Sequence, residues 1–378
     1  MTKKKQEAKA LILSGGGVKG TFQYGAVDHI YNHVLDEGER FKIVCGISAG
    51  AMNASIIAQN KFQLGKNLWF DQIKKGVPAF KFKYSLWTLI LYGVLPGICL
   101  LCKLKKTDSL FKNKELRKIL TETSKDLLRV LEETDTYLRT GIVEYQTGKY
   151  ISADPTKPEY RNRVVDVIMA STTIPCIFPP VEMRKYDYFD GGVVNVTPFA
   201  EIFEITRTPE FKEKYNLSMI YSIMCSPLST QETYQEYTDI LGIAQRTLDI
   251  LTKEIYVNDK EIFERTNAYV WFKQKIEEVF PDKDKLEEIY DQILKETGID
   301  VRKYATAECK IISPDPAKWK DYMESDLWPK DLPKPKNGDS EKLFWEYWPS
   351  DLDKDKEKLI ACYYFGTYMA RNLLGSKR

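Results

Sequence analysis

Two short apolar segments, each followed by a turn of small residues and then by a helix-like segment, constrain the fold of this chain most. The first is "ALILS" at residues 10–14, which runs into "GGGVKG", and the second is "KIVC" at residues 42–45, which runs into "GISAG". An apolar run that ends at glycine is typical of a buried strand entering a turn. After the first turn, Val27, Ile30 and Val34 recur at helical spacing. Two such units within about sixty residues predict an α/β domain with a parallel sheet.

Further strands and helices are expected downstream. The expected strands are "RTGIVEY", "YDYFDGG", "LSMIYSIMC" and "CKIISP", and the expected helical stretches include "VVDVIMASTTI" and the long segment at residues 238–296. Neither an internal repeat nor a clear linker is visible, which favours one elaborated domain. We expect a basic solvated tail at residues 1–8, a catalytic core at residues 9–206, and a C-terminal part of the same domain at residues 207–378, helical with closing strands.

The composition is that of a folded, nearly neutral protein. Hydrophobic residues make up 43% of the chain, and 56 Lys plus Arg stand against 54 Asp plus Glu, so neither disorder nor nucleic-acid binding is indicated. Seven scattered cysteines without a secretory signal favour reduced thiols and a cytoplasmic location. Cys99 and Cys102 have CxxC spacing, but they lie in an apolar run without a second pair, so no metal site is expected there.

That apolar run, "LWTLILYGVLPGICLLC", begins at Leu86 and ends at Cys102. It is shorter than the roughly 20 residues of a spanning helix and is interrupted by glycine and proline. Lysines flank it on both sides, an arrangement expected where an apolar element enters an anionic interface. The segment, placed in an insertion at about residues 84–106, therefore predicts peripheral membrane contact; a buried helical hairpin and an active-site lid are the alternatives.

The glycine-rich turn allows two interpretations. Gly15, Gly17 and Gly20 fit GxGxxG, the spacing of a dinucleotide-binding turn, but the same loop could present N–H groups to an oxyanion. About 20 residues past the loop the chain reads "DEGER", with no acidic residue clearly at the end of the second strand, which disfavours the dinucleotide interpretation.

The second turn carries GxSxG, with Gly46 and Gly50 flanking Ser48. A nucleophilic serine sits on such a sharp, strained turn between a strand and a helix. The chain has only two histidines, His29 and His33, and both precede the serine, which excludes the order serine, acid, histidine of α/β hydrolases. On a helical wheel both histidines fall opposite the apolar face, so we expect them to face solvent.

The base must then be a carboxylate or a lysine. Asp190 ends a predicted strand in "YFDGGVVNVTP" and is followed by Gly191 and Gly192, an arrangement that aims a carboxylate from a tight turn. Taken alone, this segment favours an ordinary Asp-Gly turn.

The elements "GGGVKG", "GISAG" and "DGG", in this order, resemble the patatin-like phospholipase family from about residue 11 to residue 198. The resemblance implies a three-layer α/β/α sandwich with a mainly parallel central sheet and helical insertions. It implies a lipid acyl hydrolase that needs no metal or cofactor and acts on a phospholipid or another acyl lipid. Acyl transfer, hydrolysis of other esters, and an idle membrane- or partner-binding module remain the alternatives.

Carried over residue by residue, the resemblance makes Ser48 the nucleophile and Asp190 the general base. The oxyanion hole falls on Gly15, Gly16, Gly17 and Val18, with Lys19, Gly20, Gly46, Gly50, Gly191 and Gly192 in support. Lys19 stands where many members have arginine; it keeps the positive charge and loses the fork geometry.

Overall fold

The computed structural model of the protein describes residues 5–76, 81–82, 109, 111–228, 240–298, 301, 308–334, 338–349 and 353–376. The N-terminal half contains β1 (Gln6–Leu13), η1 (Gly17–Lys19), α1 (Gly20–His33), β2 (Ile43–Gly46), α2 (Ala49–Ile57), α3 (Phe62–Lys74), β3 (Lys81–Phe82), β4 (Phe111–Lys112), α6 (Lys114–Thr123), α7 (Leu127–Thr134), β5 (Tyr137–Glu144), β6 (Lys149–Ala153), η2 (Arg161–Arg163), α8 (Val164–Ser171), β7 (Val181–Met183) and β8 (Tyr186–Asp190). There follow η3 (Gly191–Val193), α9 (Phe199–Thr206), α10 (Pro209–Lys214), β9 (Tyr215–Ile223), α11 (Ile240–Val279), α12 (Lys283–Thr297), β10 (Glu308–Ile312), η5 (Pro316–Lys318), α13 (Trp319–Glu324), α14 (Ser340–Tyr347) and α15 (Lys356–Leu374).

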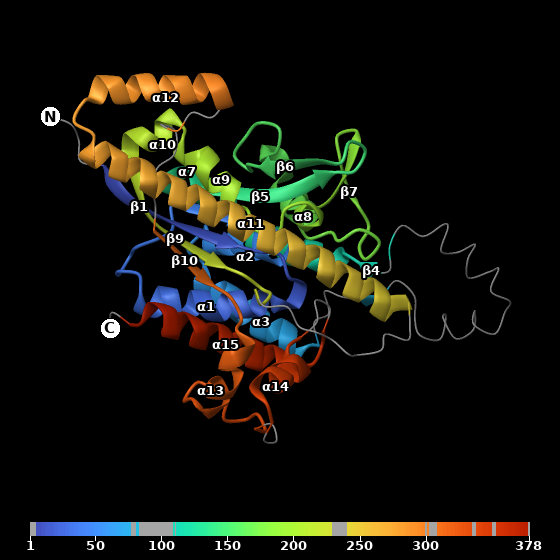
Figure 1. Ribbon diagram of the computed structural model, residues 1–378. Coiled ribbons are helices and arrows are strands. Elements are labelled where there is room, and N and C mark those ends of the chain that lie inside the picture. Colours follow the sequence, from blue (N-terminus) through green and yellow to red (C-terminus); the bar gives the residue numbers. More distant parts are fainter. Residues whose placement is uncertain are drawn as a thin grey trace.

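A mostly parallel sheet forms the centre of the molecule, in the order β10, β9, β1, β2, β5, β8, β7, with β6 also paired to β5. The five strands from β10 to β5 are parallel neighbours, whereas β6, β7 and β8 pair antiparallel. In Figure 1, α1, α3 and α15 lie on one side of this sheet and α9, α10 and α11 on the other. The expected α/β/α sandwich is confirmed, and so are the four downstream strands predicted from the sequence.

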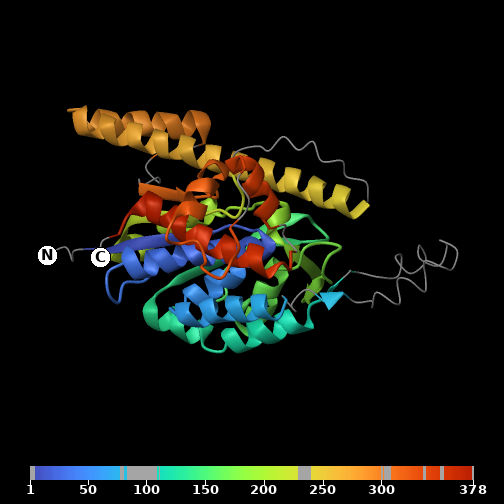
Figure 2. The same cartoon turned by 90° about the horizontal axis from the view of Figure 1, so that it is seen from below.

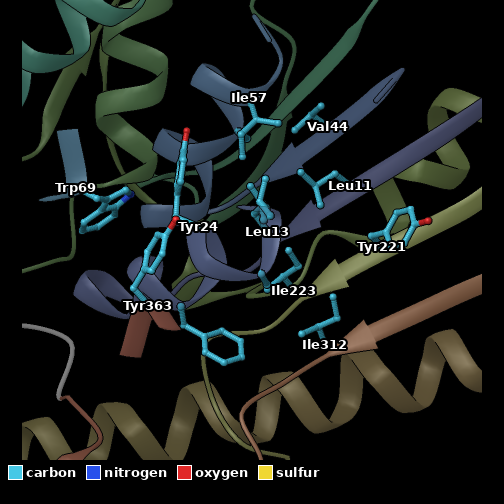
Figure 3. Close-up of a cluster of buried hydrophobic side chains, with 14 of the residues drawn as sticks. Leu11, Leu13, Tyr24, Val44, Ile57, Trp69, Tyr221, Ile223, Ile312 and Tyr363 are labelled. Atoms are coloured by element: carbon cyan, nitrogen blue, oxygen red, sulfur yellow. The ribbon is translucent and has the colours of Figure 1, made fainter. Parts of the chain in front are cut away.

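The two faces of the sheet carry separate hydrophobic cores because successive strand residues point to opposite faces. Leu11 and Leu13 of β1 pack toward α1, α2 and α15, as Figure 3 shows for their neighbours Tyr24, Ile57 and Tyr363. Ala10 and Ile12 face the other way, onto α9, α10 and the N-terminal half of α11.

The C-terminal helix α15 completes the core on the α1 side. A Cβ on Gly25 of α1 would lie 1.7 Å from the carbonyl oxygen of Tyr363, and one on Gly366 would lie 2.0 Å from that of Phe22. The two helices therefore approach closely only because glycine stands at both positions. Residues from both ends of the chain thus share one hydrophobic core.

The expected solvated tail at residues 1–8 is wrong for its last three residues. Residues 6–8 belong to β1, where Gln6 pairs with Tyr215 of β9 and Ala8 is buried. The strand begins with the exposed polar residues Gln6 and Glu7, so its start has no apolar signal in the sequence.

The predicted membrane contact at residues 86–102 lies outside the described residues and stays a prediction, as does the cytoplasmic location. Within the part of the chain that the structure describes, no helix has the length and apolar character needed to cross a bilayer. None of the five cysteines in that part forms a disulfide.

Candidate active site

Ser48 lies in the tight connection between β2 and α2. Its backbone has φ 57° and ψ −128°, a strained conformation for a residue with a side chain. Its N–H donates to Ser171 Oγ at 3.1 Å. A Cβ on Gly46 would lie 2.2 Å from the Gly50 carbonyl oxygen, and one on Gly50 would lie 2.2 Å from that of Leu13. Glycine is therefore required on both sides of the serine, which confirms the predicted sharp turn.

The glycine loop, residues 15–18 after β1, lies next to this turn. This is because β1 and β2 are parallel neighbours, so their carboxyl ends lie at the same edge of the sheet. A Cβ on Gly15 would lie 3.4 Å from the Cβ of Ser48. One on Gly16 would clash with the Cys225 side chain at 2.3 Å, and Gly17 has a φ of 53°. The loop therefore passes directly beside the serine along a path that side chains would block.

The second half of the loop, from Gly17 onward, has backbone N–H groups that can donate hydrogen bonds. The short helix η1 begins at Gly17, and the first N–H groups of a helix have no partner within it. Val18 is fully buried against Ile73 of α3 and Leu359 of α15, which holds η1 in place. The N–H of Gly15, in contrast, donates to the Val196 carbonyl at 3.1 Å. Of the four residues expected in an oxyanion hole, Gly15 is therefore engaged elsewhere.

Asp190 reaches the same edge from an antiparallel strand. In the sheet register Asp190 is opposite Ile142 of β5, while Thr140 of β5 is opposite Gly46 at the end of β2. The last residue of β8 therefore lies near the end of β2.

The carboxylate of Asp190 is held in a fixed orientation. It is 3% exposed, and its Oδ1 accepts a hydrogen bond from Gly192 N at 2.8 Å. A Cβ on Gly191 would lie 2.5 Å from the backbone of Gly141, so the turn after the aspartate also needs a glycine.

Two cavities meet at Ser48, each with about 790 Å³ of empty space including its mouth. The first is almost wholly apolar and is lined by Met52, Ile56, Leu68, Trp69, Leu116, Ile119 and Phe178, among others. The second contains the glycine loop, Lys19, Asp190 and Gly192. Gly17 and Ile174 line both cavities together with Ser48, so the serine stands at their junction.

Lys19 and Gly20, both expected to support the site, lie in different surroundings. Lys19 is buried at 7% exposure and lines the cavity that holds Asp190. Gly20 begins α1, and a Cβ there would lie 3.0 Å from Trp69 and 3.1 Å from Ala49. The Gly20 carbonyl accepts a hydrogen bond from Asn53 Nδ2 at 3.1 Å. Gly20 thus lets α1 pack closely against α2 and α3 behind the glycine loop.

The expectation that both histidines face solvent is wrong for His29. Its side chain is 2% exposed, and its Nε2 lies 2.7 Å from the carbonyl oxygen of Gly375, whereas His33 is exposed. The helical wheel misplaced His29 because the end of α15 packs over this part of α1. Neither of the chain's two histidines lines either cavity.

Tyr256 of α11 lines the cavity with Ser48 and Asp190 and was not predicted from the sequence. A tyrosine within a 40-residue helix gives no signal of its own, since its position depends on how α11 crosses the sheet. Asp259, one turn later, was also missed. Among the described residues no group of three or more His, Cys, Asp or Glu side chains is arranged to hold a metal ion.

Comparison with known proteins places the chain in a family. The model for "Patatin-like phospholipase" matches residues 11–203, just over half of the chain. A solved structure, VipD from Legionella pneumophila, aligns over 98% of this chain and 67% of its own, with 16% identity and a TM-score of 0.36. No curated protein sequence matches. The chain belongs to the patatin-like phospholipase family, and this membership indicates a lipid hydrolase.

Proposed function

We propose that the protein is a lipid acyl hydrolase of the phospholipase A or lysophospholipase type, with Ser48 as nucleophile and Asp190 as general base. Ser48 Oγ attacks the ester carbonyl while Asp190 takes its proton, and the N–H groups of Gly16, Gly17 and Val18 receive the oxyanion. The tetrahedral intermediate collapses to an acyl-enzyme as Asp190 returns the proton to the leaving alcohol. Asp190 then activates water, which releases the fatty acid and restores the serine.

The observation that carries this proposal is the position of Ser48 at the junction of the two cavities. The apolar cavity suits an acyl chain, since each buried methylene contributes about 0.8 kcal/mol. The other cavity brings a carboxylate and backbone N–H groups to the reacting ester. A substrate with a long acyl chain attached through an ester can occupy both at once.

The choice of Asp190 as base rests on its position and on the other titratable groups near the serine. A serine hydroxyl becomes an effective nucleophile only beside a base, and neither histidine lines the cavities. The hydrogen bond from Gly192 N orients the Asp190 carboxylate, and Lys19 contributes positive charge to the same cavity.

A peripheral membrane contact through residues 86–102 is part of the proposal and rests on the sequence alone. Replacing Leu89, Ile90 and Leu91 by serine should reduce binding to anionic vesicles and should reduce hydrolysis of vesicle lipid more than that of a short soluble ester. Equal losses on both substrates would contradict a membrane contact.

The reaction class is tested by product analysis. Wild type, Ser48→Ala and the matched control Ser55→Ala, a serine of α2 that lines neither cavity, are incubated with mixed phospholipid vesicles and the lipids are quantified. Free fatty acid that depends on Ser48 and not on Ser55 supports the hydrolase. Acyl groups found on an acceptor lipid would indicate an acyltransferase, and no product dependent on Ser48 would indicate an idle binding module.

A further inference from the structure

The long helix α11 crosses the sheet on the side of α9 and α10 (Figure 1). It follows, in the sequence, the residues that match the family model. Figure 2 shows the same helix extending beyond the sheet and its covering helices, with α12 beside its far end. Where α11 packs on the sheet, Tyr256 and Asp259 lie about one turn apart. The side chain of Tyr256 contacts the backbone of Gly15, and that of Asp259 contacts the backbone of Thr197.

Tyr256 holds the start of the glycine loop. Its side chain is 2% exposed, and its hydroxyl lies 2.8 Å from the Gly15 carbonyl oxygen and 2.5 Å from Ser14 Oγ. Ser14 Oγ accepts a hydrogen bond from Cys225 N at 2.9 Å and donates to the same Gly15 carbonyl at 3.0 Å, so the Tyr256 hydroxyl holds this carbonyl both directly and through Ser14. The hydroxyl therefore joins the ends of β1 and β9 at the point where the loop begins.

Asp259 holds the segment that follows Asp190. Its Oδ2 accepts a hydrogen bond from Thr197 N at 3.1 Å. The neighbouring carbonyl of Val196 accepts from Gly15 N at 3.1 Å, so the segment after Asp190 and the glycine loop are bonded to each other. The helix thus contacts both of these segments, which themselves carry the proposed oxyanion donors and the proposed base.

The contact at Gly15 bears on catalysis because of peptide geometry. The carbonyl of Gly15 and the N–H of Gly16 belong to one planar trans peptide unit and point in opposite directions. A hydrogen bond that fixes the Gly15 carbonyl therefore also fixes the direction of the Gly16 N–H. Oxyanion donors are effective only when they are held in place before the charge develops.

We propose that Tyr256 is a positioning residue that orients the Gly16 N–H toward the oxyanion, and that Asp259 anchors α11 for this task. This inference rests on the proposed hydrolase function. Tyr256 acts through the Gly15 peptide and exchanges no proton with the substrate.

The first test is Tyr256→Phe, which keeps the ring and removes the hydroxyl. Its matched control is Tyr269→Phe, because Tyr269 is a tyrosine of the same helix that is 46% exposed. On a soluble ester we expect Tyr256→Phe to lower kcat about tenfold to a hundredfold with little change in KM, since the donor matters mainly in the transition state. The inhibition constant of a trifluoromethyl ketone, whose adduct with serine carries an oxyanion, should rise in parallel. Tyr269→Phe should match wild type in all three values.

Asp259→Ala gives an independent test, because it frees α11 at Thr197 and leaves the Tyr256 hydroxyl in place. It should shift kcat and the inhibition constant in the same direction by a smaller factor, with the melting temperature recorded for every variant. If neither variant differs from Tyr269→Phe in these values, Tyr256 only fills space and the inference is wrong. If wild type itself shows no hydrolysis that depends on Ser48, it is the proposed function that fails.

Discussion

Filling the apolar cavity should change the chain-length preference of the enzyme without damaging its chemistry. Ile119 of α6 lines this cavity and is only partly buried, so a larger side chain there has room to enter the cavity at little cost in stability. Ile119→Trp should displace the distal part of a long acyl chain. Displacing about three methylenes costs about 2.4 kcal/mol, which corresponds to roughly a fiftyfold loss in kcat/KM.

The assay compares kcat/KM for a long-chain and a short-chain ester of the same alcohol. Ile119→Trp should lower the ratio of the long to the short ester by about fiftyfold and leave the short ester nearly unchanged. Ile262→Trp, the same change at a position that is 64% exposed on α11, serves as the control. Equal losses on both esters, or no change on either, would refute the assignment of this cavity to the acyl chain.

Three further perturbations test other parts of the site. Asp190→Asn should lose about a hundredfold to ten-thousandfold of kcat because an amide cannot take the serine proton, while Asp187→Asn should stay active; the reverse pattern would show that the base is misassigned. Gly50→Ala should destabilise the protein by on the order of 2 kcal/mol in urea unfolding, since its Cβ would lie 2.2 Å from a carbonyl oxygen. Gly76→Ala, with φ 71° and nothing within 4 Å, should cost only about 1 kcal/mol, and equal costs would refute the packing argument. Burial raises the pKa of Asp259 to about 7, so the folded state retains a proton that the unfolded state releases between about pH 4 and 7. Stability should therefore fall as pH rises through that window, by on the order of 2 kcal/mol after allowance for partial solvent contact, and parallel pH curves for wild type and Asp259→Asn would contradict this.

The motif residues were predictable because each lies in a recognisable local sequence pattern. Ser48 lies between an apolar strand and a helix with glycine on both sides, and the close contacts of Gly46 and Gly50 explain why those glycines are needed. Asp190 ends a strand before two glycines. That Asp190 lies near Ser48, however, depends on the antiparallel register of β8. The pairing of these two residues was inferred from the family resemblance.

Other features depend on long-range packing that local patterns do not contain. His29 is buried because α15 arrives from the other end of the chain, and a helical wheel of α1 alone places it in solvent. The short strands β6 and β7 were not predicted, because β6 is mostly exposed or half-buried and β7 has only 3 residues. Tyr256 acquires its contacts only when α11 crosses β1, some 240 residues earlier in the sequence.

The role of Ser48 as the nucleophile is tested most directly by identifying the residue that a fluorophosphonate modifies. Wild type, Ser48→Ala and Ser55→Ala are treated with the probe, their intact masses are measured, and the modified peptide is sequenced. We expect a single adduct on Ser48 in wild type and in Ser55→Ala, and no adduct in folded Ser48→Ala. An adduct that persists in Ser48→Ala, or that maps to another residue in wild type, would contradict the assignment of Ser48 as the nucleophile.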